Sequence, residues 1–301
     1  MSVESIIALV GPTGVGKTEL ALQVALRLNA EIVNADSRQV YRHLDIGSAK
    51  PTPAQQALVR HHLLDVVNPD EPFDCARYRD LALQAIADIQ RRQHRVLLCG
   101  GTGLYLKVLM GGLFSGPARD PVLRRQLEAD EQKSPGCLHE RLQRVDPATA
   151  RRVHPHDRVR IVRALEVALR SRRPMSAWQA EHAFADRQLP IVPIGLTVER
   201  PLLYERINAR CRAMVDAGLI DEVRGLRQHG FGPDLLPLQS IGYREIGAFL
   251  RGEMSLDAAI EQMARATRHF AKRQLTWFRA TPGLRWLDAR AASVDAIACT
   301  T

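Results

Sequence analysis

The sequence predicts an α/β protein: a parallel sheet flanked by helices, with an inserted all-helical domain and a helical C-terminal part. Short apolar runs alternate with helix-like stretches up to about residue 110, which is typical of parallel strands joined by helical connections. From about residue 117 to 188 there is no strand-like run, and a last apolar run at Ile191–Val198 then returns the chain to the sheet. We therefore expect residues 1–116 and 189–301 to form one core, and residues 117–188 to form a helical insertion.

The individual elements follow from the spacing of the apolar residues. An amphipathic helix is predicted over Phe73–Gln93, where apolar side chains recur three or four positions apart. The polar segment 37–53 contains a glycine and two prolines and is predicted to be a loop. The chain from Pro201 onward is predicted to be helical. The strands predicted before residue 110 are Ile6–Val10, Ala30–Asp36, His62–Val67 and Arg95–Cys99.

The first predicted strand leads directly into a glycine-rich turn that matches the pattern G-x-x-x-x-G-K-[ST] and is followed by a helical pattern. Backbone N–H groups of such a turn and the positive end of its helix bind phosphate oxygens. The predicted parallel sheet is therefore P-loop NTPase-like. Lys17 would add a charge to the terminal phosphates, and the Thr18 hydroxyl would bind Mg²⁺. The motif alone is that of an ATP-binding protein, but any di- or triphosphate fits it. The residues of the turn are Gly11, Pro12, Thr13, Gly14, Val15, Gly16, Lys17 and Thr18.

Composition limits the remaining classes of function. No window approaches the roughly 18 consecutive apolar residues of a membrane span, and the N-terminus lacks the positive region of a signal peptide. Five scattered cysteines without a C-x-x-C pair support neither a disulfide framework nor a structural zinc site. We expect a cytoplasmic monomer with no membrane partner.

The positive charge is concentrated in the predicted insertion. The chain has a formal net charge of +9 and a pI near 9.7. Residues 119–173 contain fourteen arginines and lysines but eight acidic residues, so this segment carries most of the excess. A second basic window without acidic residues lies between Glu261 and Asp288. Basic residues placed in this way favour a polyanionic partner such as a nucleic acid.

The residues around the phosphate loop indicate which chemistry uses it. A hydrolase of this type needs an aspartate at the end of a buried strand to hold Mg²⁺, but the strand at 95–99 ends in Gly100-Gly101-Thr102, and there is no N-K-x-D motif. Asp36 follows the second strand, at the sheet edge where ligands bind, and could deprotonate a nucleophile. Its alternative role is to cap the next turn through Ser37. The residues favour a transferase with Mg²⁺, a phosphate leaving group and an RNA or DNA acceptor.

Six short sequence motifs lead to a more specific hypothesis about function. The phosphate loop GPTGVGKT is accompanied by NADSRQVYRHLDIGSAKP, VLLCGGTGLYL, HPHDRVRIVRALEV, QSIGYREI and AKRQLTWFR. With these blocks in order across nearly the whole chain, the sequence closely resembles the bacterial tRNA dimethylallyltransferases, the tRNA isopentenyltransferase family. No Cys-His pattern follows Cys211, so we expect no counterpart of the eukaryotic members' C-terminal zinc finger in this sequence.

The resemblance implies the reaction and its catalytic residues. The phosphate loop would hold the diphosphate of dimethylallyl diphosphate, and the prenyl group would pass to the exocyclic N6 amine of the adenosine just 3′ of the anticodon, in tRNAs that read codons beginning with U. By resemblance, Asp36 is the general base and Thr102 lies near the reacting centre. Arg210 assists the diphosphate, with Arg206 as a neighbouring candidate.

The resemblance also implies contacts with the tRNA anticodon stem-loop. The chain departs from the family at Val159, where a glutamine is usual and a valine cannot form the same hydrogen bond. The expected tRNA contacts are Asp36, Ser37, Arg38, Gln39, Thr102, Arg124, Val159, Arg160, Ile161, Val162, Arg163, Gln239, Ser240, Ile241, Gly242, Tyr243 and Arg244.

Three other functions share parts of this pattern. A small-molecule or nucleotide kinase would explain the phosphate loop but not the arginine-rich insertion. A non-catalytic RNA-binding ATPase would explain both but would not need Asp36. A prenyltransferase acting on free AMP would need Asp36 and the loop but no RNA contact.

Overall fold

The computed structural model describes residues 5–114, 116–183, 186 and 189–299. The chain divides into two compact units, one formed by Met1–Met110 with Leu189–Thr301 and the other by Gly111–Gln188. The sequence places the first boundary a few residues later, at 116/117. No helix in the described ranges has both the length and the apolar character needed to cross a membrane.

The first unit is built on one parallel sheet with the strand order β3-β2-β4-β1-β5-β6. The strand β1 lies near the middle and is buried over its whole length, as expected for a strand covered on both faces. The predicted α/β fold class is confirmed. The strands are β1 (Ile6–Val10), β2 (Ala30–Asn34), β3 (His61–His62), β4 (Arg95–Gly100), β5 (Ile191–Thr197) and β6 (Arg285–Asp288).

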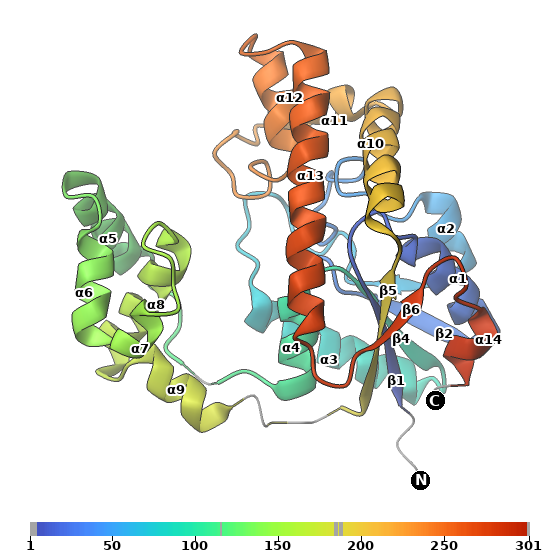
Figure 1. Cartoon of the computed structure of the whole chain (residues 1–301), viewed down its shortest axis with the longest axis horizontal. Helices are drawn as coiled ribbons and strands as arrows, with labels where there is room; N and C mark the ends of the chain where they lie inside the picture. The colour runs from blue at the N-terminus through green and yellow to red at the C-terminus, as the bar shows by residue number, and fades with distance from the viewer. Residues whose placement is uncertain (1–4, 115, 184–185, 187–188, 300–301) are drawn as a thin grey trace. The chain divides into compact units, whose positions relative to one another are not determined.

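Helices cover both faces of this sheet (Figure 1). Alternate strand residues such as Ile7 and Leu9 join one buried cluster with helices α1, α10, α11 and α13. Helix α3 packs on β2 and β4 and buries Tyr78, which stacks on Tyr105 of α4. The helices of this unit are α1 (Lys17–Leu28), α2 (Pro53–Leu58), α3 (Cys75–Arg91), α4 (Gly103–Gly111), α10 (Arg200–Asp216), α11 (Leu219–Gln228), α12 (Tyr243–Leu250), α13 (Leu256–Arg279) and α14 (Val294–Ala298).

Two of the predictions for this unit are wrong. The strand expected at His62–Val67 is only the two-residue β3, because Leu63 and Asp65 have positive φ angles of 64° and 53° that interrupt an extended strand. The C-terminal part is not entirely helical, and the strand at 191–197 is not the last, because β6 pairs with β5 at the sheet edge. β6 spans only four residues, too few to give a clear periodicity.

The second unit is all-helical in its described residues. Its small core contains Leu127, Leu138, Leu142, Ile161 and Leu165, contributed by three helices. Helix α6 packs against α5, α7 and α8. The helices are α5 (Pro121–Lys133), α6 (Cys137–Val145), α7 (Pro147–Ala150), α8 (Arg158–Ser171) and α9 (Met175–His182).

Candidate active site

The turn between β1 and α1 has the geometry of a phosphate-binding loop. Gly14 and Gly16 have φ angles of 83° and 101°, which residues with a side chain rarely adopt. A Cβ on Gly11 would lie 2.7 Å from the carbonyl oxygen of Leu196, so only glycine fits against β5 there. No side chain caps the start of α1 at Gly16, which leaves the first backbone N–H groups of this helix available to a ligand.

Lys17, the first residue of α1, reaches back over this loop. Its Nζ donates to the carbonyl oxygens of Gly11 (3.0 Å) and Pro12 (2.8 Å). Burial lowers the pKa of its ammonium group to about 8, although the neighbouring Cys99 and Asp36 act in the opposite direction. An anion bound in the loop would stabilise the charged form, because it would replace the missing hydration.

Two arginines of α10 approach the same loop. Arg210 donates from Nη2 to the Thr13 hydroxyl (2.6 Å), while its buried Nε has no hydrogen-bond partner among the described residues. Burial also lowers the pKa of Arg210. The Nη1 atom of Arg206 lies 3.5 Å from the carbonyl oxygen of Val15. Arg210 is therefore the more enclosed of the two, and its unpartnered N–H is suited to an anionic ligand.

Asp36 lies just beyond the carboxyl end of β2. Its Oδ1 accepts from the backbone N–H of Arg38 (2.8 Å), and its own N–H donates to Asn34 Oδ1 (3.1 Å). The Asn34 side chain is buried and also donates to Leu63 O (3.1 Å). Asp36 Oδ2 accepts no hydrogen bond from the residues described. One carboxylate oxygen is thus held in place, while the other can accept a proton.

Thr102 lies beside Asp36 through direct backbone contacts. Its hydroxyl oxygen accepts from Ser37 N–H (3.0 Å), and its N–H donates to Ala35 O (3.0 Å). Gly100 permits this approach, because a Cβ there would collide with the backbone of Ala35. These hydrogen bonds therefore hold the turn after β4 against the end of β2.

Asp36, Lys17 and Arg210 line one cavity of about 590 Å³ at the carboxyl ends of β1, β2 and β4, and Thr102 directly follows Gly100 and Gly101 of its lining. Asp36 lies close enough to Lys17 and Arg210 to influence their charge. Gln39 also lines the cavity and donates to the carbonyl oxygens of Ser48 and Ala49. Other residues of the lining are Thr13, Gly14, Gly16, Thr18, Lys50, Gln55, His61, Cys99, Gly100, Gly101, Arg206 and Gln274.

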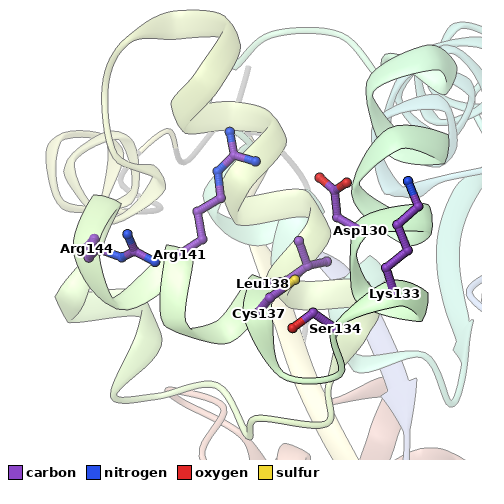
Figure 2. Close-up of a pocket in the computed structure, with 7 residues that line it drawn as sticks. All are labelled: Asp130, Lys133, Ser134, Cys137, Leu138, Arg141 and Arg144. Atoms are coloured by element: carbon purple, nitrogen blue, oxygen red, sulfur yellow. The ribbon is translucent and has the colours of Figure 1, made fainter.

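A second hollow, of about 420 Å³, lies between α5 and α6 of the helical unit (Figure 2). Lys133, Arg141 and Arg144 line it together with one acidic residue, Asp130. None of these three cations forms an ion pair within the described ranges. The hollow lacks the phosphate loop, so it is a basic surface and not the catalytic centre.

The structure separates the RNA-contact residues predicted in the helical unit into buried and exposed groups. Glu166 is fully buried and accepts hydrogen bonds from the Arg124 and Arg163 side chains (2.6–2.8 Å). Ile161 and Val162 are 2% and 4% exposed. Arg124, Arg163 and the two aliphatic residues therefore hold the unit together, and the aliphatic side chains cannot reach RNA.

The exposed group is smaller. Val159 is 76% exposed, and the side chain of Arg160, which pairs with Asp157, is 65% exposed. Both lie on the first turn of α8. They are the members of the predicted segment that can meet a large ligand, despite the departure from the family at Val159.

The segment 239–244 is partly exposed and partly structural. Tyr243 is buried and donates its hydroxyl hydrogen to Glu222 Oε1 (2.6 Å), whose carboxylate also accepts the backbone N–H groups of residues 45–47. Gln239 donates to Pro233 O (2.6 Å), and Ser240 donates to a neighbouring carbonyl. Arg244 is half-exposed and pairs with Glu245. The block thus braces the loop after β2, with Arg244 facing solvent.

Sequence analysis missed Asn34, Glu222 and Gln274. Asn34 and Gln274 lie within blocks that carry the family resemblance, but nothing in their spacing reveals their partners. Glu222 lies outside every recognised motif, and an acidic side chain on an amphipathic helix usually faces solvent.

The fold and the site together define a phosphate-binding protein of the P-loop class with a carboxylate at the neighbouring strand end. The family described as IPP transferase matches residues 39–281. The tRNA dimethylallyltransferase of Syntrophobacter fumaroxidans is 52% identical over 94% of this chain and 83% of its own length. The tRNA dimethylallyltransferase of Geobacter sulfurreducens is 49% identical over 94% and 91%.

Solved structures agree with these relatives. The full-length tRNA isopentenylpyrophosphate transferase of Bacillus halodurans is 38% identical, with a TM-score of 0.71 over 99% of this chain and 94% of that one. A eukaryotic dimethylallyltransferase acting on tRNA is 28% identical, with a TM-score of 0.80 over 95% of this chain and 74% of that one. The chain belongs to the IPP transferase family and is a prenyl-transferring enzyme.

Proposed function

We propose that the protein transfers the dimethylallyl group of dimethylallyl diphosphate to the N6 amine of the adenosine 3′-adjacent to the anticodon, in tRNAs that read codons beginning with U. The observation that carries this proposal is the single cavity shared by Asp36 and Lys17. It offers one end to an anionic leaving group and the other to a nucleophile that must lose a proton.

The phosphate loop binds the group that departs. Its backbone N–H groups, Lys17 and Arg210 surround the diphosphate and stabilise the charge that develops as the allylic carbon–oxygen bond breaks. The buried Arg210 Nε gains an acceptor in this complex. No energy from nucleotide hydrolysis is needed, because the diphosphate leaves with the electron pair of the broken bond.

Magnesium fits the donor set of this site. No group of three or more His, Cys, Asp or Glu side chains in the described part of the chain could hold a metal ion. Mg²⁺ commonly takes one or two protein oxygens and completes its shell with substrate phosphates and water. Thr18, on the cavity wall at the start of α1, would provide such an oxygen. When bound, the ion would neutralise charge on the diphosphate.

Asp36 acts on the acceptor. The adenine N6 attacks C1 of the prenyl group, the C1–O bond breaks, and the N6 proton passes to Asp36 as the new C–N bond forms. Thr102 accepts from the Ser37 N–H, so its own hydroxyl hydrogen is free to orient the acceptor. The adenine must leave its stack in the anticodon loop to enter the cavity, as in other base-modifying enzymes.

Exposed cations bind the tRNA backbone. In the first unit, the half-exposed Arg244 serves this purpose. In the helical unit, Arg160 and the cations that line the hollow in Figure 2 do so, whereas Arg124 and Arg163 act indirectly by holding Glu166. Phosphate contacts of this kind position the RNA without reading its sequence.

The test is a transfer assay with purified protein, dimethylallyl diphosphate, Mg²⁺ and unmodified tRNA, followed by mass spectrometry of the digested RNA. The expected product is N6-prenylated adenosine, with none from a control tRNA that lacks the target adenosine. A protein that consumes ATP and leaves the tRNA unchanged would refute the proposal, and prenylation of free AMP but not of tRNA would identify a different acceptor.

A further inference from the structure

Gln274 joins the phosphate loop to the turn that follows β4. The residue lies on α13 and is only 5% exposed. Its Oε1 accepts the backbone N–H of Thr13 (2.8 Å), and its Nε2 donates to the carbonyl oxygen of Gly101 (2.9 Å). Because both ends of the amide are engaged, one side chain links two backbone segments that follow different strands.

The packing around this amide leaves little freedom. A Cβ on Gly101 would collide with Gln274 Nε2, and a Cβ on Gly103 would collide with the indole ring of Trp277. Gln274 and Trp277 lie three residues apart, which places them on the same side of α13. The helix therefore contacts the Gly-Gly-Thr-Gly turn closely, through two side chains that glycines accommodate.

The contact extends to the acceptor side of the cavity. The residue after Gly101 is Thr102, whose N–H and hydroxyl group bind Ala35 and Ser37 on either side of Asp36. On the other side of Gln274, Thr13 is held a second time, through the hydrogen bond from Arg210 to its hydroxyl. Hydrogen bonds joined by short backbone segments thus connect the diphosphate-binding groups to the two residues that flank Asp36.

We propose that Gln274 is a positioning residue that sets the separation between the bound diphosphate and the acceptor groups Asp36 and Thr102. The inference rests on the proposed function, since it concerns the geometry of that transfer. Gln274 lines the cavity, but both ends of its amide are engaged by backbone groups, so it acts through Thr13 and Gly101. Displacing reacting groups by about 1 Å can reduce a rate on the order of 10²-fold, which makes such a link consequential.

The experiment compares Gln274→Met and Gln274→Glu with a matched control. Methionine keeps the length of the side chain but removes both hydrogen bonds, whereas glutamate keeps the acceptor for Thr13 and loses the donor to Gly101. Gln90→Met, at an exposed position on α3, makes the same chemical change away from the cavity. Each variant is assayed for kcat at saturating substrates, for tRNA and dimethylallyl diphosphate affinity, and for its melting temperature.

We expect Gln274→Met to lower kcat by at least about tenfold and to change tRNA affinity by less than about threefold, with Gln274→Glu also impaired and Gln90→Met unchanged. A merely structural role would lower the melting temperature and the yield of active enzyme without changing kcat per active site, measured by titration. Wild-type kcat in either folded Gln274 variant would overturn the inference. Absence of product from the wild-type enzyme would instead reject the proposed function.

Discussion

The lowered pKa of Lys17 predicts how binding of the prenyl donor depends on pH. With a pKa of about 8 in the free protein, the ammonium form predominates at pH 7 and is a minority at pH 9. If the diphosphate binds only the charged form, the apparent affinity is proportional to the fraction of Lys17 that is charged. Dimethylallyl diphosphate should therefore bind about tenfold more weakly at pH 9 than at pH 7.

Isothermal titration calorimetry without tRNA would measure this dependence. The ligand can only become more negative over this range, so its own ionisation cannot explain a loss of affinity. Lys17→Arg provides the control, because a guanidinium stays charged throughout, so its dissociation constant should not rise between pH 7 and 9. An unchanged dissociation constant in the wild-type protein between pH 7 and 9 would refute the reasoning, since the burial of Lys17 would then not govern its charge.

Three further predictions concern the base, the helical unit and the RNA surface. Asp36→Asn keeps an acceptor for the Arg38 N–H, so we expect tRNA affinity to persist while kcat falls by a factor on the order of 10² or more; a near-normal rate would exclude Asp36 as the base. Burial raises the pKa of Glu166, but hydrogen bonds from two arginines outweigh this and lower it to about 2. Its stabilising contribution should therefore be lost as the pH falls from about 4.5 towards 2, which circular dichroism would follow. Glu166→Gln should flatten this acid transition. Replacing Lys133, Arg141 and Arg144 with alanine should weaken tRNA binding and reduce its salt dependence, while dimethylallyl diphosphate binding stays constant; an unchanged salt slope would show that the hollow in Figure 2 does not meet RNA.

The parts of the molecule that could be predicted are those governed by local chain properties. The turn at Gly11–Thr18 needs glycines for its positive φ angles, a preceding apolar strand and a following helix, and all three are visible in adjacent residues. The prediction of a strand at His62–Val67 was wrong for the opposite reason, because the backbone there does not depend on local properties alone. Its apolar residues suit a strand, but the left-handed conformations of Leu63 and Asp65 arise from the surrounding fold.

The functional meaning of the arginines could not be predicted in the same way. Arg124, Arg160 and Arg163 are equivalent in a count of charges, yet two of them share a buried carboxylate and one is exposed. Whether a charged side chain is structural or free depends on where its partner lies, and Glu166 reaches Arg124 from a different helix.

The sequence by itself determined the phosphate loop, the parallel sheet, the helical insertion and the position of Asp36 at a strand end. Only the tertiary structure decided that Gln274 holds Thr13 across 261 positions of the chain, and that Arg210 holds it across 197. The physical reason is that backbone conformation and burial follow from neighbouring residues, whereas the partner of a polar side chain depends on which distant elements pack together.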